Sequence, residues 1–372
     1  MKEVRVLHVG MTPNHGGLES FVMNIYRHID RSKVQFDFLT LNGDKIAYED
    51  EIIDMGGKVY PLIYKRRDLV KHFFNLPLKF LNSHKEIQVI HFHKSHLADL
   101  DNLIVAKICG VPVRIVHAHS SGYIFPLGRI TRFIEKLNKK YLDKLSTHNL
   151  SCSELAGEWM FDNLPYEVVP NAIDTDKFKF DVNKRENLRK KLSLENKFVI
   201  GHVGTFFDVK NQKFLVDVFG EFVKKRDDAK LLLIGEGPMK AEIIEKVDRM
   251  NLNNSVIFTG TKKNVNEYMQ AIDVFVLPSK FEGFPIVSVE AQSAGLPCII
   301  SSNITREIAI TDQVLFRSID NIDDWVVALE DIGNKRRRYD NLQQIKNAGY
   351  DIKTMSKHME LFYINAVKLS HR

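Results

Sequence analysis

Cysteine is scarce in this chain, and long apolar runs are missing. The three cysteines, Cys109, Cys152 and Cys298, are far apart and lack the paired spacing of a disulfide framework or a metal knuckle, so we expect free thiols in a reducing cytosol. No segment approaches the roughly 18 apolar residues of a membrane span. The apolar N-terminal stretch is short and interrupted by Arg5, which does not fit a signal peptide. We therefore expect a cytoplasmic protein.

A strong charge of one sign is also missing. A formal net charge of +6 over 372 residues fits an anionic ligand, an anionic membrane surface or nucleic acid equally well. The basic residues do not follow any recognised nucleic-acid-binding module, so we expect no nucleic-acid partner. A hydrophobic content of 44% with 27% charged residues predicts a folded globular protein, and the length suits two domains.

Short β-branched runs alternate with amphipathic stretches, which predicts the parallel sheets of an α/β fold. The expected strands are Val4–Val9, Val34–Leu39, Gln88–Phe92, Val113–Val116, Phe198–Val203, Leu231–Ile234, Val256–Thr259, Val274–Leu277 and Cys298–Ser301. A polar stretch, residues 170–194, interrupts the alternation. We predict two doubly wound, Rossmann-like domains, 1–178 and 185–350, facing each other across a cleft. Whether the C-terminal segment, 353–372, packs back on the first domain stays open.

Glycines follow the first expected strand, where loops of parallel sheets bind ligands. At Gly16 and Gly17 bare backbone N–H groups can approach an anion, although a tight turn needs glycine equally. A dinucleotide fingerprint would need G-x-G-x-x-G, whereas Gly10 is followed by Met11 and Thr12. The sequence therefore does not favour an NAD site.

Four histidines close two neighbouring expected strands. His91 and His93 end one strand, and His117 and His119 end the next. Such clustering is typical of a metal site, but only alternate residues of a strand point the same way and no Cys, Asp or Glu stands beside them at ligand spacing. We expect no metal. Structural packing and a contact with substrate both stay open for these side chains.

The second expected domain opens with a diphosphate-binding pattern. Gly204 ends its first strand, and Lys210 stands just before a helix that begins near Asn211. A lysine beside a helix N-terminus suits a diphosphate, although surface lysines are common. Further along, Glu282 lies in a loop and Glu290 lies beyond the first turn of an apolar helix. Their separation of about 12 Å along an ideal helix suits two hydroxyl-binding groups better than a hydrolytic pair.

Four motifs together give the chain a family resemblance. Glu282 to Glu290 resembles the E-x7-E motif of the retaining family 4 glycosyltransferases, which have the GT-B fold and include exopolysaccharide and capsule enzymes. The other three are similar to that family's GGxE loop, PNGVD hinge and L-x-G-x-G-P turn, and they stand at residues 16–19, 170–174 and 233–238. The four motifs stand in the same order as in the family, and the resemblance covers nearly the whole chain.

The resemblance implies a role for each motif. Glu290 would hold the ribose hydroxyls of a nucleotide, Glu282 and the backbone of Gly283, Phe284 and Pro285 would hold the transferred sugar, and Lys210 would neutralise the diphosphate. The remaining positions implied for donor binding are Gly16, Gly17, Gly204, Gly235 and Pro278. A histidine of the first domain would contact the donor sugar, and His117 and His119 are both candidates. No protein-bound metal or other cofactor is implied.

Two positions depart from the family pattern. Thr205 stands where the family usually has an arginine, and Ala172 replaces the glycine of PNG. The missing arginine removes one phosphate clamp. Asp174 and Asp176 form a D-x-D that is typical of metal sites in the other major glycosyltransferase fold, but its place after the hinge indicates a linker.

The sequence thus predicts a retaining transferase that moves a sugar, most simply from a UDP-sugar, onto a glycan or lipid-linked acceptor. Two alternatives stay open: another GT-B enzyme, such as an epimerase or phosphorylase, and a non-catalytic paralogue that binds sugar nucleotides. Residues 128–145 and 64–85 combine basic with apolar side chains, as in helices on anionic lipid. For residues 128–145 we favour the simpler interpretation, an ordinary helix that packs its apolar stripe on the sheet and solvates its lysines.

Overall fold

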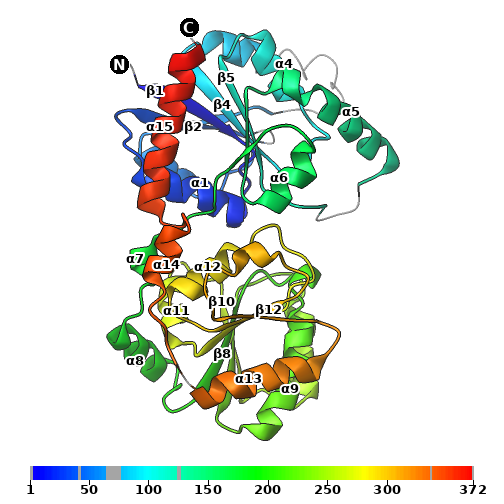
Figure 1. Cartoon of the computed structure of the whole chain (residues 1–372), viewed down its shortest axis with the longest axis vertical. Coiled ribbons are helices and arrows are strands. Elements are labelled where there is room, and N and C mark those ends of the chain that lie inside the picture. Colours follow the sequence, from blue (N-terminus) through cyan, green and yellow to red (C-terminus); the bar gives the residue numbers. More distant parts are fainter. Residues whose placement is uncertain (1–2, 41–42, 64–76, 124–126, 336, 371–372) are drawn as a thin grey trace. The chain divides into compact units, whose positions relative to one another are not determined.

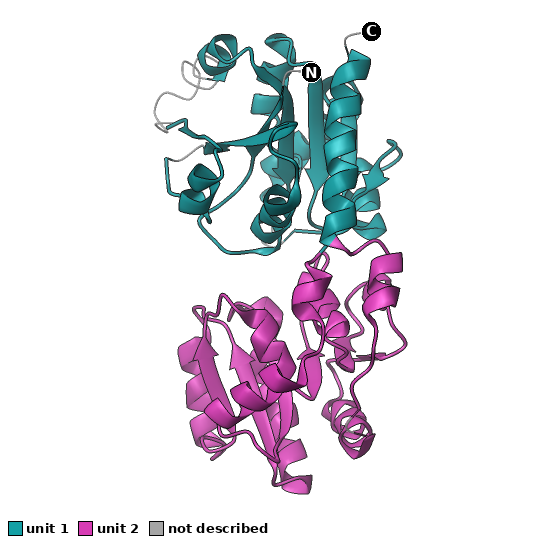
Figure 2. Cartoon of the chain, turned by 90° about the vertical axis from the view of Figure 1, so that its left-hand side faces the viewer, with its two compact units in different colours: residues 1–172, 352–372 teal, residues 173–351 magenta. Residues whose placement is uncertain are grey.

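The computed structural model describes residues 3–40, 43–63, 77–123, 127–335 and 337–370 (Figure 1). The chain divides into two compact units (Figure 2). The first unit comprises Met1–Ala172 and Ile352–Arg372, and the second comprises Ile173–Asp351. The first unit thus ends at Ala172 rather than at residue 178. Within the described ranges, no helix is both long enough and apolar enough to cross a bilayer.

The first unit is built on a parallel sheet. Its strands are β1 (Val4–Val9), β2 (Val34–Thr40), β3 (Val59–Pro61), β4 (Ile87–Lys94), β5 (Val113–Ala118), β6 (His148–Ser151) and β7 (Glu167–Val168). They lie in the order β3-β2-β1-β4-β5-β6-β7, and every neighbouring pair is parallel. The central strands are almost continuously buried because helices cover the sheet, which explains why most of their residues are apolar.

Helices from both ends of the chain pack on this sheet. They are α1 (Gly17–His28), α2 (Glu49–Asp54), α4 (Asp101–Ile108), α5 (Arg129–Leu145), α6 (Glu154–Phe161) and α15 (Ile352–Ser370). Helix α15 packs against α1 and contacts β1, β2, β4 and β5 (Figure 1). It contributes Met359 and Tyr363 to the same buried core as Phe36. The last helix in sequence is therefore an integral part of the first unit.

The second unit repeats the architecture. Its strands are β8 (Phe198–Val203), β9 (Ala229–Ile234), β10 (Val256–Gly260), β11 (Val274–Leu277), β12 (Cys298–Ser301) and β13 (Val314–Arg317). They form a parallel sheet in the order β10-β9-β8-β11-β12-β13. Its helices are α7 (Thr175–Phe178), α8 (Val182–Lys191), η2 (Asp208–Lys210), α9 (Gln212–Lys225), α10 (Lys240–Arg249), α11 (Val265–Ala271), α12 (Ile286–Ser293), η3 (Arg306–Ile308), α13 (Ile322–Lys335) and α14 (Leu342–Asn347). The two sheets confirm the predicted pair of Rossmann-like domains.

The polar stretch at residues 170–194 contains two helices, α7 and α8, and is not an open linker. Asp174 caps α7 by accepting a hydrogen bond from the N–H of Lys177 at 3.2 Å. Thr175 is buried and donates its hydroxyl to Asp351 at 2.7 Å, and Asp176 pairs with Lys346 at 3.3 Å. Each member of the D-x-D therefore has a structural partner in the second unit.

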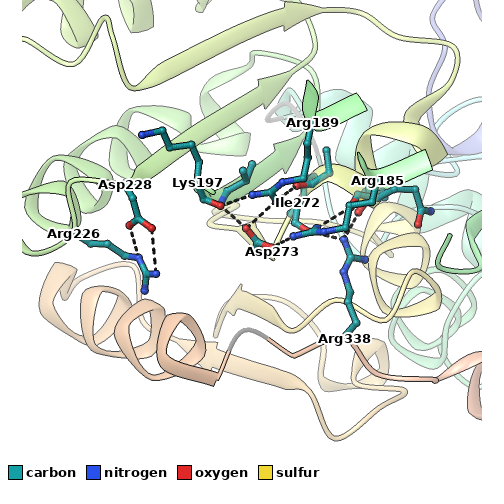
Figure 3. A network of polar contacts seen from close by, with 12 residues as sticks. Arg185, Arg189, Lys197, Arg226, Asp228, Ile272, Asp273 and Arg338 are labelled. Carbon is teal, nitrogen blue, oxygen red and sulfur yellow. Dashed lines mark hydrogen bonds and ion pairs between the residues drawn. The ribbon is translucent and has the colours of Figure 1, made fainter. Parts of the chain in front are cut away.

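Helix α8 is attached through arginines rather than through apolar side chains (Figure 3). Arg185 and Arg189 both bind the Asp273 carboxylate, which precedes β11 and so lies away from the C-terminal ends of the strands. Arg338 is half-buried nearby and donates to the main-chain carbonyls of Met269, Gln270, Ile272 and Ala294. Burial and the neighbouring Arg185 lower the pKa of Arg338 to about 9. Carbonyls at the C-terminal ends of α11 and α12 complement this excess of positive charge.

The glycines of the turn after β9 are required by close packing. A Cβ on Gly235, which has φ +143°, would lie 2.0 Å from the carbonyl oxygen of Gly204. A Cβ on Gly237 would lie 2.6 Å from the backbone nitrogen of Phe206. Phe206 N–H in turn donates to the Glu236 carbonyl at 2.8 Å. The L-x-G-x-G-P turn therefore supports the loop after β8 from behind.

Candidate functional site

Two loops at the C-terminal ends of β8 and β11 are joined in the second unit. The Asn211 side chain donates to the carbonyl of Pro278 at 3.2 Å, and the Lys280 N–H donates to the carbonyl of Val209 at 2.8 Å. Asn211 has φ 56°, a left-handed conformation that asparagine tolerates, and it turns the chain from η2 into α9. The loop that carries Lys210 is thereby fixed against the loop that carries Glu282.

Lys210 and Glu282 meet between these loops. Lys210 Nζ lies 2.6 Å from Glu282 Oε1, and the Ser279 hydroxyl donates to the same oxygen at 2.7 Å. The two charged side chains are only 19% and 13% exposed. A half-buried ion pair at the ends of parallel strands provides a cation and an acceptor side by side, as binding of a phosphorylated sugar requires.

Glu290 lies on the second turn of α12, in an apolar environment. The helix begins at Ile286 after Pro285, and Val289 and Ala291 on either side of Glu290 are buried. Burial raises the pKa of Glu290 to about 8. A carboxyl group in such a position needs a hydrogen-bonding partner, and a pair of ligand hydroxyls would supply one.

In the first unit, Glu19 organises the glycine loop before α1. Its buried carboxylate accepts hydrogen bonds from the Gly16 N–H at 3.1 Å, the Thr12 N–H at 3.0 Å and the Thr12 hydroxyl at 2.7 Å. Gly16 must be small because a Cβ there would lie 2.8 Å from Glu19 Oε2. A Cβ on Gly17 would meet no atom within 4 Å, so its surroundings are open.

Five histidines form a network at the ends of β1, β4 and β5 in this unit. His8 Nδ1 lies 2.9 Å from His93 Nε2, and His93 Nδ1 lies 2.8 Å from His119 Nε2. A second chain joins His91 Nδ1 to the Tyr363 hydroxyl at 2.8 Å and His91 Nε2 to His117 Nδ1 at 3.1 Å. Each of the five imidazoles therefore belongs to one of two separate hydrogen-bonded chains.

Burial keeps these imidazoles neutral. It lowers the pKa of His8 and of His119 to about 3, and the pKa values of the three other rings also lie well below the ordinary value. Among the described residues, two triplets bring ring nitrogens within 4.8 Å of one another. The triplets are His8, His91 and His93, and His93, His117 and His119. Neutral imidazole is also the form that binds metals, so the spacing alone does not decide between hydrogen bonding and coordination.

Comparison of the amino-acid sequence with known proteins identifies the family to which the chain belongs. The model of Glycosyltransferase Family 4 matches residues 15–177, and the model of Glycosyl transferases group 1 matches residues 183–350. The putative glycosyltransferase EpsF of Bacillus subtilis is 35% identical over 321 residues, which are 82% of this chain and 80% of EpsF. The chain belongs to glycosyltransferase family 4.

Two other proteins extend the comparison. The UDP-Gal:alpha-D-GlcNAc-diphosphoundecaprenol alpha-1,3-galactosyltransferase of Escherichia coli is 25% identical over 311 residues, covering 81% of this chain and 80% of that enzyme. The crystal structure of HepE from Anabaena in complex with UDP superimposes with a TM-score of 0.79 at 16% identity, over 98% of this chain and 100% of that one. The second likeness shows that the glycosyltransferase has the GT-B fold.

The site residues predicted for the glycosyltransferase lie in different parts of the structure. Lys210, Glu282 and Pro278 lie in the two joined loops. The Phe284 ring stacks on Tyr350, with centroids 5.6 Å apart, and so anchors the loop whose backbone is predicted to hold the sugar. Gly235 supports the loop after β8 by its close approach to Gly204. His117 and His119 lie in the other unit, one on each chain of histidines.

Sequence reasoning missed two polar residues of the glycosyltransferase that support the β8 loop. The Gln212 side chain donates to the carbonyl of Thr205 at 3.0 Å and lies 3.3 Å from His202 Nε2. His202 is fully buried, its other ring nitrogen lies 3.0 Å from the carbonyl of Val276, and burial lowers its pKa to about 4. A histidine within the apolar strand 198–203 was the available signal, because a buried polar side chain there needs a partner.

Proposed function

We propose that this glycosyltransferase moves a hexosyl or N-acetylhexosaminyl group from a UDP-sugar, with retention, to a glycan or lipid-linked acceptor in cell-surface polysaccharide biosynthesis. The observation that carries the proposal is the cluster of Lys210, Glu282 and Ser279, with Glu290 on the helix that follows. The relative named for UDP-Gal and a diphosphoundecaprenol-linked sugar supports the donor and the acceptor class. HepE supports the donor class because its fold matches and its structure holds UDP.

In the proposed reaction, the bond between the anomeric carbon and the β-phosphate oxygen breaks, and its electron pair stays on UDP. The acceptor hydroxyl oxygen bonds to the anomeric carbon on the same face, and its proton passes to the departing phosphate oxygen. Negative charge therefore grows on the diphosphate, where Lys210 stabilises it. Lysine has three N–H donors, so Lys210 can bind phosphate while it keeps its bond to Glu282.

Glu282 acts in this scheme as a hydroxyl acceptor and not as a nucleophile. Its Oε1 already accepts hydrogen bonds from Lys210 and Ser279, which reduces its nucleophilicity and orients its free lone pairs. The reaction then proceeds without a covalent intermediate, assisted by the leaving phosphate. Trapping of a stable glycosyl-enzyme adduct on Glu282 would contradict this route.

We also infer that no protein-bound metal or other cofactor is required. Lys210 is only 19% exposed beside Glu282, and its positive charge would stabilise a diphosphate without a divalent ion. Transfer should therefore continue at an unchanged rate in excess EDTA. A rate that falls and returns with Mg²⁺ would contradict the inference.

Calorimetric titration with UDP, GDP and ADP tests the donor site. We expect selective binding of UDP to the wild-type protein and loss of that binding in Lys210→Ala and in Glu290→Ala. Lys213→Ala is a matched control, because Lys213 pairs with Glu242 on the surface of α9 and should leave affinity unchanged. No binding to any of the three diphosphates would remove the donor-site assignment and favour a protein without this chemistry.

Analysis of the reaction products distinguishes a transferase from the alternative functions. The transferase yields UDP and a longer glycan, with UDP release that depends on acceptor. An epimerase or phosphorylase of the same fold would instead release free sugar or sugar phosphate. A non-catalytic paralogue would bind UDP-sugar and leave it intact.

We further propose that α5 lies on an anionic bilayer. The helix buries Glu135 and, of its apolar stripe, Leu142, whereas the other members of the stripe are exposed and do not pack on the sheet. The exposed members of the stripe are Ile130, Phe133, Ile134, Leu137 and Tyr141.

Basic residues flank the exposed stripe. They are Arg129, Arg132, Lys136, Lys140 and Lys144, and all are exposed. This combination suits a helix whose apolar side enters the headgroup region of anionic lipid. The second basic segment, 64–85, lies largely outside the described residues.

Sedimentation with lipid vesicles tests the α5 surface. At low salt the wild-type protein should sediment with phosphatidylglycerol vesicles and not with phosphatidylcholine vesicles, and Phe133→Ser with Leu137→Ser should reduce binding at least tenfold. Val327→Ser is the matched control, because Val327 is an equally exposed apolar residue on α13. Equal binding of the control and the double variant, or no binding by the wild type, would contradict the proposal.

A further inference from the structure

A buried chain of hydrogen bonds lies beneath the loop that follows β8 in the second unit. His202 Nδ1 lies 3.0 Å from the carbonyl oxygen of Val276, which can only accept, so the ring must carry its proton on Nδ1. Burial lowers the pKa of His202 to about 4, so at neutral pH the ring is uncharged and its Nε2 is a bare acceptor. The direction of the chain is therefore fixed at its first member.

Gln212 is the second member of the chain, and its orientation follows from the first. Its amide nitrogen lies 3.3 Å from His202 Nε2 and 3.0 Å from the carbonyl oxygen of Thr205, and both of these atoms can only accept. The NH2 group of Gln212 must therefore face both partners. His202 is fully buried and Gln212 is 1% exposed, so solvent water does not compete for these bonds. The chain thus connects β11, β8 and α9 to one carbonyl of the loop after β8.

Both peptide planes that meet at Thr205 are held in place. In the plane after it, Gln212 binds the Thr205 carbonyl, and the Phe206 N–H donates to the turn after β9 at 2.8 Å. In the plane before it, the Gly204 carbonyl points at that same turn, because a Cβ on Gly235 would lie 2.0 Å from its oxygen and 2.9 Å from its carbon. The N–H of a trans peptide points opposite to the carbonyl. The Thr205 N–H therefore points away from the turn.

This backbone N–H lies next to Lys210. Thr205 is exposed, and its N–H has no acceptor among the described residues. The Cδ and Cε atoms of Lys210 lie 3.6 and 3.7 Å from the point that a Cβ on Gly204 would occupy, so the lysine side chain crosses the backbone just before Thr205. It ends 2.6 Å from Glu282 Oε1. A fixed N–H without a partner beside an ammonium group suits an oxygen of a phosphate.

We propose that His202 and Gln212 are positioning residues that hold the Thr205 N–H toward the donor diphosphate, so that this backbone donor makes the phosphate contact for which the family usually has an arginine. The inference rests on the proposed function, in which Lys210 binds the diphosphate. A peptide N–H carries no net charge, so its contribution depends on being oriented before the phosphate arrives. The buried chain supplies that orientation, and the side chain of Thr205 is not required for the contact.

The amide signal of Thr205 in ¹⁵N-labelled wild-type protein tests the contact directly. The signal is assigned by its loss in Thr205→Ala. UDP should move the Thr205 amide proton to lower field, because a new hydrogen bond to a phosphate oxygen deshields it. Uridine has no phosphate and should leave the signal in place. A Thr205 signal that stays unchanged while UDP shifts other amides of the loop would overturn the proposal.

Substitution of Gln212 tests the positioning role. Gln212→Met keeps the length of the side chain and removes both donors. UDP affinity should fall about tenfold, the worth of a hydrogen bond to a charged group, whereas uridine affinity should not change. Gln270→Met is the matched control, because Gln270 is an equally buried glutamine that donates to the carbonyls of Phe178 and Asn266. The control should lower Tm and leave both affinities unchanged. Equal losses for UDP and uridine in Gln212→Met, or an unchanged UDP affinity, would overturn the proposal.

His202 and Thr205 supply two independent measurements. Ring ¹⁵N spectroscopy should show a neutral Nδ1–H tautomer of His202 at pH 7, with an Nε2 shift that changes in Gln212→Met; an Nε2–H tautomer would contradict the chain. Thr205→Pro removes the N–H and Thr205→Ala keeps it, so UDP should bind about tenfold more weakly to the proline variant than to the alanine variant. If Gln212→Met does not fold, this pair decides, and equal affinities of the two variants would count against the proposal.

These outcomes separate the inference from the function on which it rests. If the wild type binds UDP while the Thr205 signal stays in place and Gln212→Met keeps its affinity, the inference is wrong and the proposed function stands. If the wild type binds no nucleotide, the proposed function fails, and the inference fails with it because there is no diphosphate to contact. A Thr205 signal that moves with UDP, together with a loss of affinity confined to UDP in Gln212→Met, supports both.

Discussion

At the scale of single residues, the carboxyl group of Glu290 couples folding stability to pH. Burial raises its pKa to about 8 in the folded protein, above the ordinary value of an unfolded chain. The folded state therefore holds a proton that the unfolded state has lost between about pH 4.5 and pH 8. Stability contributed by Glu290 is fully present below this window, falls as the pH rises through it, and is constant above it.

We expect the free energy of unfolding of the wild type to fall by about 1–2 kcal/mol between pH 6 and pH 8.5 relative to Glu290→Gln, whose amide does not titrate. Thermal unfolding of both proteins at each pH measures this difference. Glu330→Gln, an exposed pair partner of Lys225, is the control and should parallel the wild type. Parallel curves for wild type and Glu290→Gln would show that the carboxyl is solvated.

Substitution of Thr205, which stands where the family usually has an arginine, tests whether a second cation strengthens phosphate binding. It is exposed, and its carbonyl is already held by Gln212, so a longer side chain has room without loss of a bond. Thr205→Arg should strengthen UDP binding about tenfold, since a hydrogen bond to a charged group is worth about 1.5 kcal/mol or more. Thr205→Met, of similar length and no charge, should leave affinity unchanged in the same titration. Equal affinity of the arginine variant would mean that Lys210 already completes the clamp.

At the scale of elements, α8 depends on one carboxylate. Asp273 accepts from Arg185, Arg189 and the backbone N–H of Val199, and Arg338 lies beside it. Asp273→Asn removes the carboxylate that Arg185 and Arg189 both bind. We expect a loss of about 3–5 kcal/mol in stability, because breaking a buried ion pair leaves charge uncompensated. Denaturant titration measures it, with the exposed Asp312→Asn as control; a loss below about 1 kcal/mol would contradict the account.

The elements also show what sequence pattern can and cannot predict. Strands such as Val4–Val9 and Val274–Leu277 were predicted residue for residue, because central parallel strands are buried on both faces and therefore rich in apolar and β-branched residues. The short strands β3, β6, β7 and β13 were missed, since their side chains are mostly half-exposed and carry no such run. Helix α8 was missed because its one buried residue is Arg189, which periodicity assigns to solvent.

The candidate site, too, was only partly predictable from sequence pattern. Lys210, Glu282 and Glu290 were predicted as site residues because four motifs stand in order, whereas the hydrogen bonds of Glu282 to Lys210 and Ser279 were not predictable from spacing. The histidines of β4 and β5 were grouped correctly, but His8 was overlooked because it stands 83 residues before His91 in another strand. Only the sheet order, with β1 between β2 and β4, brings His8 beside His93.

At the scale of the whole molecule, the two units should respond to different changes. Lys210, Glu282 and Glu290 all belong to the second unit, and the buried Met359 of α15 belongs to the core of the first. Met359→Ala should cost the first unit about 2–5 kcal/mol, and a domain of this size loses about 2–4 °C in Tm per kcal/mol.

Scanning calorimetry with and without saturating UDP checks this separation. We expect one transition that UDP raises and that Met359→Ala leaves in place, and a second transition that Met359→Ala lowers. Val247→Ala, a buried substitution on α10, should have the opposite pattern and lower the transition that UDP raises. A single transition that all three treatments move together would show that the last helix couples the units into one cooperative whole, because a cooperative protein cannot unfold one part while the other keeps its ligand.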